Sequence, residues 1–186
     1  MNTNLNQTSW QGQNAWVLEN ESIRTIIVPE MGAKIVSLWD KQRQREWLAG
    51  AGERPFRKVA YAAAFTDQDM SGWDEMFPTI VACNYPASGK YKGAHLPDHG
   101  EVWSLPWKIE MAEASKLVLS VEGKALPYRL TRTMEYSSSA TLQLSYQAEN
   151  LGTECMPYLW AAHPQFICDQ DAEIILPAQV TQVNNV

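Results

Sequence analysis

The stretch Ala140-Thr141-Leu142-Gln143-Leu144-Ser145-Tyr146-Gln147-Ala148 alternates between apolar and polar residues at every position after the first. Successive side chains of a β-strand point to opposite faces, so the apolar members of this stretch would share one face and the polar members the other. The pattern predicts a strand with one buried face and one face in water.

Similar segments occur on both sides of this stretch. Residues 23–28, 34–39, 107–111, 117–121 and 128–136 are rich in β-branched or aromatic residues and are separated by Gly, Pro, Asn or Asp. The charged run 40–45 is typical of a hairpin connection to 46–48, and residues 156–160 and 174–177 also have strand-like composition. Because no helical pattern intervenes, we expect an all-β chain folded as an antiparallel β-sandwich. The sandwich is expected to be incomplete at the C-terminus, which would leave an unpaired edge there.

Length and charge restrict the class of protein. A chain of 186 residues suits one domain, spanning residues 1–186. The net charge of -6 and the pI of about 5.1 argue against a nucleic-acid or membrane partner. No run of eighteen apolar residues and no export segment is visible, which favours a cytoplasmic location. The three cysteines have no CxxC spacing and are expected to be free thiols.

Two of the three histidines stand among aromatic and small residues. His163 lies in Leu159-Trp160-Ala161-Ala162-His163-Pro164-Gln165-Phe166, and His99 lies in Pro97-Asp98-His99-Gly100, with Trp103 following. Imidazole exchanges protons near neutral pH, and aromatic rings suit the apolar faces of a sugar, so this setting suggests proton transfer on a sugar. A core histidine satisfied by the backbone is an equally good interpretation of His163.

The segment Gly72-Trp73-Asp74-Glu75-Met76-Phe77-Pro78 combines two carboxylates with aromatic rings. Trp73, Asp74, Glu75 and Trp160 are therefore candidate sugar-binding residues, against the alternative that the carboxylates are solvated loop charges. A calcium loop is rejected because Pro78 occupies the position where a closing glutamate is needed. A His95–His99 metal pair is disfavoured because Pro97 breaks the helix it would require. No metal is expected.

Other catalytic motifs are missing from the sequence. It contains no G-x-S-x-G, no Walker loop and no G-x-G-x-x-G, so a catalytic serine and a nucleotide cofactor are not supported.

The ordered segments 20–23, 28–40, 72–78, 98–101 and 162–166 together resemble the aldose 1-epimerase (galactose mutarotase-like) superfamily, over its N-terminal two-thirds. The resemblance implies an antiparallel β-supersandwich that binds a monosaccharide and interconverts its anomers by acid/base ring opening, without a cofactor. His99 matches the family histidine that holds the sugar and polarises its ring oxygen, and His163 matches the general acid.

Two departures from the family pattern limit this expectation. The family's general base is a glutamate on a much later strand, and this chain stops 23 residues after His163 (186 minus 163). The expected arginine after the His-Gly motif is replaced by Glu101, Val102 and Trp103, which disfavours a phosphosugar. The alternatives are a non-catalytic carbohydrate-binding module or an inactive fragment. An exposed final strand would favour a homodimer by edge pairing.

Overall fold

The computed structural model describes residues 2–113 and 115–182, and within these ranges almost all regular structure is β-strand. Helix is confined, in the described ranges, to two single 3-10 turns, η1 (Phe65–Asp67) and η2 (Val102–Ser104). All pairs of named strands are antiparallel. The predicted all-β antiparallel sandwich is therefore confirmed.

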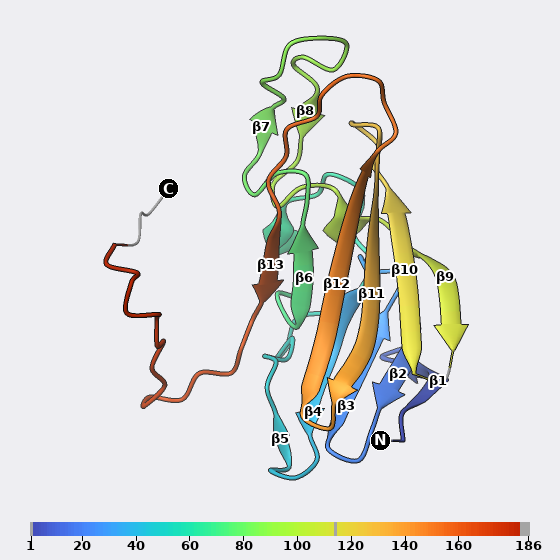
Figure 1. Ribbon diagram of the computed structural model, residues 1–186, viewed down its shortest axis with the longest axis vertical. Coiled ribbons are helices and arrows are strands. Elements are labelled where there is room, and N and C mark those ends of the chain that lie inside the picture. Colours follow the sequence, from blue (N-terminus) through green and yellow to red (C-terminus); the bar gives the residue numbers. More distant parts are fainter. Residues whose placement is uncertain (1, 114, 183–186) are drawn as a thin grey trace.

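Two sheets pack face to face (Figure 1). The first, sheet A, has the order β1-β2-β3-β4-β6-β13, with β5 also paired to β4, and the second, sheet B, has the order β12-β11-β10-β9. Sheet A is made of β1 (Asn4–Trp10), β2 (Gln13–Glu19), β3 (Ile23–Val28), β4 (Lys34–Asp40), β5 (Arg45–Glu46), β6 (Trp73–Met76) and β13 (Ala161–Pro164). Sheet B is made of β9 (Lys108–Glu113), β10 (Lys116–Glu122), β11 (Tyr128–Ser138) and β12 (Thr141–Asn150). A small hairpin, β7 (Cys83–Asn84) and β8 (His95–Leu96), lies at one end of the molecule.

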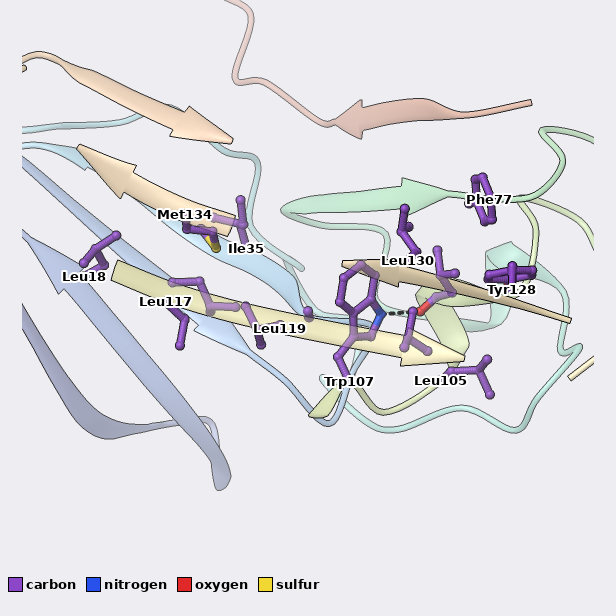
Figure 2. Packing of buried hydrophobic residues seen from close by; sticks show 14 of the residues in the cluster. Leu18, Ile35, Phe77, Leu105, Trp107, Leu117, Leu119, Tyr128, Leu130 and Met134 are labelled. Carbon is purple, nitrogen blue, oxygen red and sulfur yellow. Dashed lines mark hydrogen bonds between the residues drawn. The ribbon is translucent and has the colours of Figure 1, made fainter. Parts of the chain in front are cut away.

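The core fills the space between the sheets. Leu18 and Ile35 from sheet A, and Leu117 and Leu119 from sheet B, are at most 1% exposed and belong to one cluster (Figure 2). Full burial of each such side chain stabilises the fold by about 1.5–3 kcal/mol. Trp107 lies in the same cluster, and its indole N–H donates to the Val102 carbonyl at 2.9 Å. That hydrogen bond satisfies a polar group that would otherwise be costly to bury.

The alternating stretch that predicted the sandwich is β12, which pairs along its length with β11. Leu142, Leu144 and Tyr146 are half-buried on its inner face, whereas Ala148 is exposed. The other five predicted strands correspond to β3, β4, β9, β10 and β11. The charged run 40–45 forms the expected hairpin turn, in which the Asp40 carboxylate accepts the backbone N–H groups of Gln42 and Arg43.

Three features differ from expectation. Strands β1, β2, β6, β7 and β8 were not anticipated. Residues 156–160 are not a strand, because regular pairing with β6 begins only at Ala161. The predicted strand at 174–177 is also wrong: Ile174 and Ile175 are 90% and 87% exposed, and no described strand pairs with this segment. An apolar run alone does not make a strand, because strand propensity depends on packing against neighbouring strands.

All three cysteines, Cys83, Cys155 and Cys168, are free, as expected. In the ranges 2–113 and 115–182, no helix is long and apolar enough to cross a membrane.

Candidate active site

The pairing of β6 with β13 decides which candidate side chains share a face. His163 lies opposite Asp74, and Ala162 lies opposite Glu75. Directly paired residues project to the same side of a sheet, and neighbours along a strand project to opposite sides. His163 and Asp74 therefore occupy one face of sheet A, and Glu75 occupies the other. The strand separates two carboxylates that are adjacent in sequence.

The two candidate histidines come together on the outer face of sheet A. The ring centroids of His99 and His163 are 5.2 Å apart. Phe65, from η1, stacks on the His99 ring with centroids 3.8 Å apart and planes 4° apart, and its ring meets His163 edge-on at 5.2 Å. Phe65 is only 2% exposed, so it is a fixed wall that restricts the orientation of both imidazoles.

A tight turn presents His99. His99 and Gly100 both have positive φ, of 60° and 74°. A Cβ at position 100 would collide with the backbone of Phe77, just beyond β6, so glycine is required where the turn passes over that segment. The N–H of Glu101 donates to the Phe77 carbonyl at 2.8 Å, and the N–H of His99 donates to the Ile80 carbonyl at 3.1 Å. These contacts hold the turn against the end of β6.

Beneath the histidine pair lies a buried cluster of charges. Lys34, the first residue of β4, is 1% exposed, and its ammonium is 3.1 Å from both Asp69 and Asp74. It also donates to the Gln68 amide oxygen at 2.7 Å and to the Ser71 carbonyl at 2.9 Å. A buried ammonium without such partners would be strongly disfavoured, so these four acceptors account for its presence in the interior.

The surroundings of His163 favour its neutral form. Partial burial lowers the pKa of His163 below its usual 6.5, and the nearby His99 and Lys34 lower it further. Its Nδ1 is buried and has no hydrogen-bond partner among the described residues. The carboxylate of Asp98 lies 3.0 Å from His99 Nδ1, but without hydrogen-bond alignment. One nitrogen of each ring is thus not engaged by a protein hydrogen bond.

Burial also raises the pKa of Asp74, while Lys34 opposes that shift. Its Oδ2 interacts with Lys34 and Gln68, whereas its Oδ1 is buried without a hydrogen-bond partner in the described chain. Desolvation makes a carboxylate a stronger base. Asp74 is therefore a candidate for proton exchange on the histidine face.

Glu75 belongs to a separate cluster between the sheets. It is fully buried and contacts Arg132 of β11 at 3.3 Å, the Tyr146 hydroxyl of β12 at 2.5 Å and the Trp160 indole N–H at 3.1 Å. Burial raises the pKa of Glu75, and these donors act in the opposite direction. The cluster links the two sheets, so the structure places Glu75 and Trp160 away from the histidine pair.

Trp73 also faces away from the histidines. It lines a groove of about 460 Å³ between the sheets, together with Trp47, Leu144 and Phe166. The predicted substrate-binding set is thus divided: Asp74 lies on the face of His99 and His163, while Trp73, Glu75 and Trp160 lie on the other face. Their functional roles stay predictions.

Glu101, which follows the His-Gly motif, is fully buried and acts as an anchor for a loop. One of its carboxylate oxygens accepts the Tyr61 hydroxyl at 2.6 Å and the backbone N–H groups of Lys124 and Ala125 at 2.9 and 2.8 Å. These contacts hold Glu101 against the 124–125 loop.

Sequence reasoning missed Phe65, Lys34 and Asp69. Phe65 and Asp69 lie in the irregular excursion between β5 and β6, where no periodic pattern identifies contacts. The sequence did give an indication for Lys34. A lysine at the start of an apolar strand either has a buried partner of opposite charge or reaches solvent with its ammonium group. Among the described residues, no group of three or more His, Cys, Asp or Glu side chains is arranged to hold a metal ion.

The aldose 1-epimerase family model matches residues 14–185, and the chain therefore belongs to this family. No match was found among curated protein sequences.

Solved structures support the fold assignment. A galactose mutarotase-like protein from Lactobacillus casei ATCC 334 is 18% identical, with a TM-score of 0.63 over 89% of this chain and 52% of that chain. A galactose mutarotase-like protein from Clostridium acetobutylicum is 16% identical, with a TM-score of 0.65 over 89% of this chain and 54% of that chain. A galactose mutarotase related enzyme from Lactobacillus acidophilus is 18% identical, with a TM-score of 0.64 over 86% and 51%. The chain spans about half the length of these structures, and at such identities the likeness concerns the fold alone.

Proposed function

We propose that the protein binds a monosaccharide at the His99–His163 pair and interconverts its anomers by acid/base ring opening. The observation that carries the proposal is the proximity of the two imidazoles: they come from positions 64 residues apart (163 minus 99), yet their ring centroids are 5.2 Å apart. Membership of the aldose 1-epimerase family makes a sugar the substrate class to test first.

In the proposed reaction His163 donates a proton to the ring oxygen while a base removes the proton of the C1 hydroxyl. The bond between C1 and the ring oxygen breaks, and the sugar becomes an open-chain aldehyde. Rotation about C1–C2 and the reverse proton transfers then close the ring as the other anomer. A lowered pKa makes protonated His163 a stronger acid, and His99 is placed to hydrogen-bond the ring oxygen.

The identity of the general base has less support than that of the general acid. Asp74 shares the histidine face, but Lys34 and Gln68 engage one of its two oxygens. Glu75 and Glu101 are held by other partners. This arrangement supports sugar binding with slow turnover, and it favours a non-catalytic carbohydrate-binding module as the second candidate.

Ligand-observed NMR with glucose and galactose, combined with polarimetry, tests the proposal. We expect the 186-residue protein to bind sugar weakly. Its rate of mutarotation should be lower, by a factor of about 10² to 10⁴, than the rate of an enzyme that has both a general acid and a general base. His163→Ala should abolish most of any acceleration, because it removes the proton donor. The exposed His95, on β8, provides the matched control His95→Ala, which should change neither signal.

Each outcome decides between hypotheses. Sugar binding that survives in the double variant His99→Ala/His163→Ala would refute the site. Binding without turnover would favour the carbohydrate-binding module. Full mutarotase activity would instead assign the base to a carboxylate of this chain, and Asp74→Asn should then abolish it.

A further inference from the structure

Three polar side chains form a cross-strand row on the outer face of sheet A. The antiparallel register of β4 and β6 places Lys34 opposite Asp74, and the ammonium is 3.1 Å from the carboxylate. The register of β6 and β13, which lie side by side, places Asp74 opposite His163 (Figure 1). Residues paired in this way have Cβ atoms about 4.5–5.5 Å apart. Asp74 is therefore the central member of the row, with an ammonium on one side and an imidazole on the other.

The buried charges around Lys34 leave one carboxylate oxygen without a donor. The two oxygens of Asp69 are engaged by the Lys34 ammonium and by the Ser71 hydroxyl. Oδ2 of Asp74 contacts Lys34 and the Gln68 amide. Oδ1 of Asp74 is buried and has no hydrogen-bond partner among the described residues. Lys34 cannot serve it as well, because four acceptors already surround the three ammonium hydrogens.

His163 has a buried nitrogen that complements this oxygen. Its Nδ1 also lacks a hydrogen-bond partner in the described part of the chain. A neutral imidazole has one N–H and one acceptor nitrogen, so Nδ1 can be the donor that Oδ1 of Asp74 lacks. A buried donor and a buried acceptor are destabilising when both stay unpaired. The terminal torsions of Asp and His have broad, two-fold preferences, so each group can turn toward the other at little cost.

We infer that Asp74 accepts the Nδ1–H of His163 and is a positioning residue for that imidazole. The hydrogen bond fixes the neutral ring as the tautomer protonated at Nδ1, which leaves Nε2 to face a ligand. When His163 gains its second proton, Nε2 carries it, and this is the proton that the ring oxygen of a sugar would receive. Nδ1–H stays on Asp74 throughout. Asp74 in this role touches no sugar, which distinguishes it from a general base.

Lys34 keeps Asp74 in the form that this role requires. Burial raises the pKa of Asp74, and the neighbouring ammonium opposes that shift. A carboxylate accepts the Nδ1–H, whereas a protonated Asp74 would donate to Nδ1 and select the other tautomer. The inference deepens the role proposed for His163, and its functional meaning rests on that proposal. The hydrogen bond itself does not require a sugar.

A nitrogen–proton NMR correlation of the histidine rings in ¹⁵N-labelled protein tests the pairing. At a pH of about 8 an imidazole is neutral, and the spectrum shows which nitrogen carries the proton. The signals of His163 are assigned by their loss in His163→Asn. We expect the Nδ1–H tautomer in the unmodified protein. Asp74→Asn should change it to Nε2–H, because the asparagine oxygen faces Lys34 and its NH₂ group then donates to Nδ1.

Asp98→Asn is the matched control. Asp98 lies 3.0 Å from Nδ1 of His99, and its side chain is 44% exposed, so this change should leave the His163 tautomer as it is. Far-ultraviolet spectra check that both variants keep the fold.

Three results would overturn the inference. The first is an Nε2–H tautomer of His163 in the unmodified protein, a measurement that needs no Asp74 variant. The others are an unchanged tautomer in folded Asp74→Asn and a changed one in Asp98→Asn. Absence of sugar binding would overturn the proposed function and not this pairing, because the tautomer is measured in the free protein.

Discussion

His163 combines partial burial with two neighbouring groups that carry positive charge when protonated. Burial lowers its pKa first, and His99 and Lys34 add to the effect. Asp74 across the strand and Phe65 above the ring complete its surroundings. The same groups that would make His163 an effective acid therefore also make its protonation costly to the fold.

We predict that the free energy of unfolding decreases as the pH falls from about 7 to about 5.5, and that His163→Asn reduces this slope. The unfolded chain gains a proton at His163 near its usual pKa of 6.5, whereas the folded chain gains it only at lower pH. Protonation thus favours the unfolded state across this window. Urea titrations at several pH values measure the slope. His95→Asn, at an exposed position, serves as the control, and an unchanged slope in His163→Asn would contradict the assigned shift.

Strand β6 places neighbouring side chains on opposite faces of sheet A. Asp74 faces the histidines, and Glu75 faces Arg132 and Tyr146 of sheet B. The ion pair of Glu75 and Arg132 has both partners fully buried, so removal of either one leaves an uncompensated charge between the sheets.

We predict that Glu75→Met destabilises the protein by about 3–5 kcal/mol and that the double variant Glu75→Met/Arg132→Met recovers much of this loss. The double change removes both charges and leaves apolar side chains in their place. Chemical denaturation of the two single variants and the double variant measures the coupling. The exposed pair Lys116–Glu135, 3.7 Å apart, is the control and should contribute less than about 1 kcal/mol. A double variant less stable than either single one would contradict this account.

The molecule is a β-sandwich with a buried core between its two sheets and an exposed segment after β13. Strands β10 and β11 lie inside sheet B, and their buried residues, such as Leu117 and Met134, belong to the core. Residues 168–182, in contrast, form no strand and are exposed.

We predict that backbone amides of β10 and β11 exchange with deuterium only through global unfolding, while those of 168–182 exchange close to the unprotected rate. Exchange followed by mass spectrometry at the peptide level distinguishes the two. Strong protection throughout 168–182 would show that this segment packs against the sheets.

Alternation in the sequence predicted most strands of the two sheets, because the period of two along a strand is a local property of the backbone. The aromatic and small neighbours of His99 and His163 singled out these two histidines, because residue types along the chain are also local information. The predicted strand at 174–177 was wrong, because local composition does not show whether a segment pairs with a neighbouring strand.

The sequence by itself determined the all-β class, the antiparallel sheets and the two histidines, since each depends on residue type and short-range pattern. Only the tertiary structure decided that His163 and Asp74 share a face while Glu75, one residue away, lies between the sheets with Arg132. It also brought Phe65 onto the histidine rings and Lys34 beneath them. These contacts join segments far apart in the chain, and their geometry follows from strand register and loop packing, which no local pattern of residues specifies.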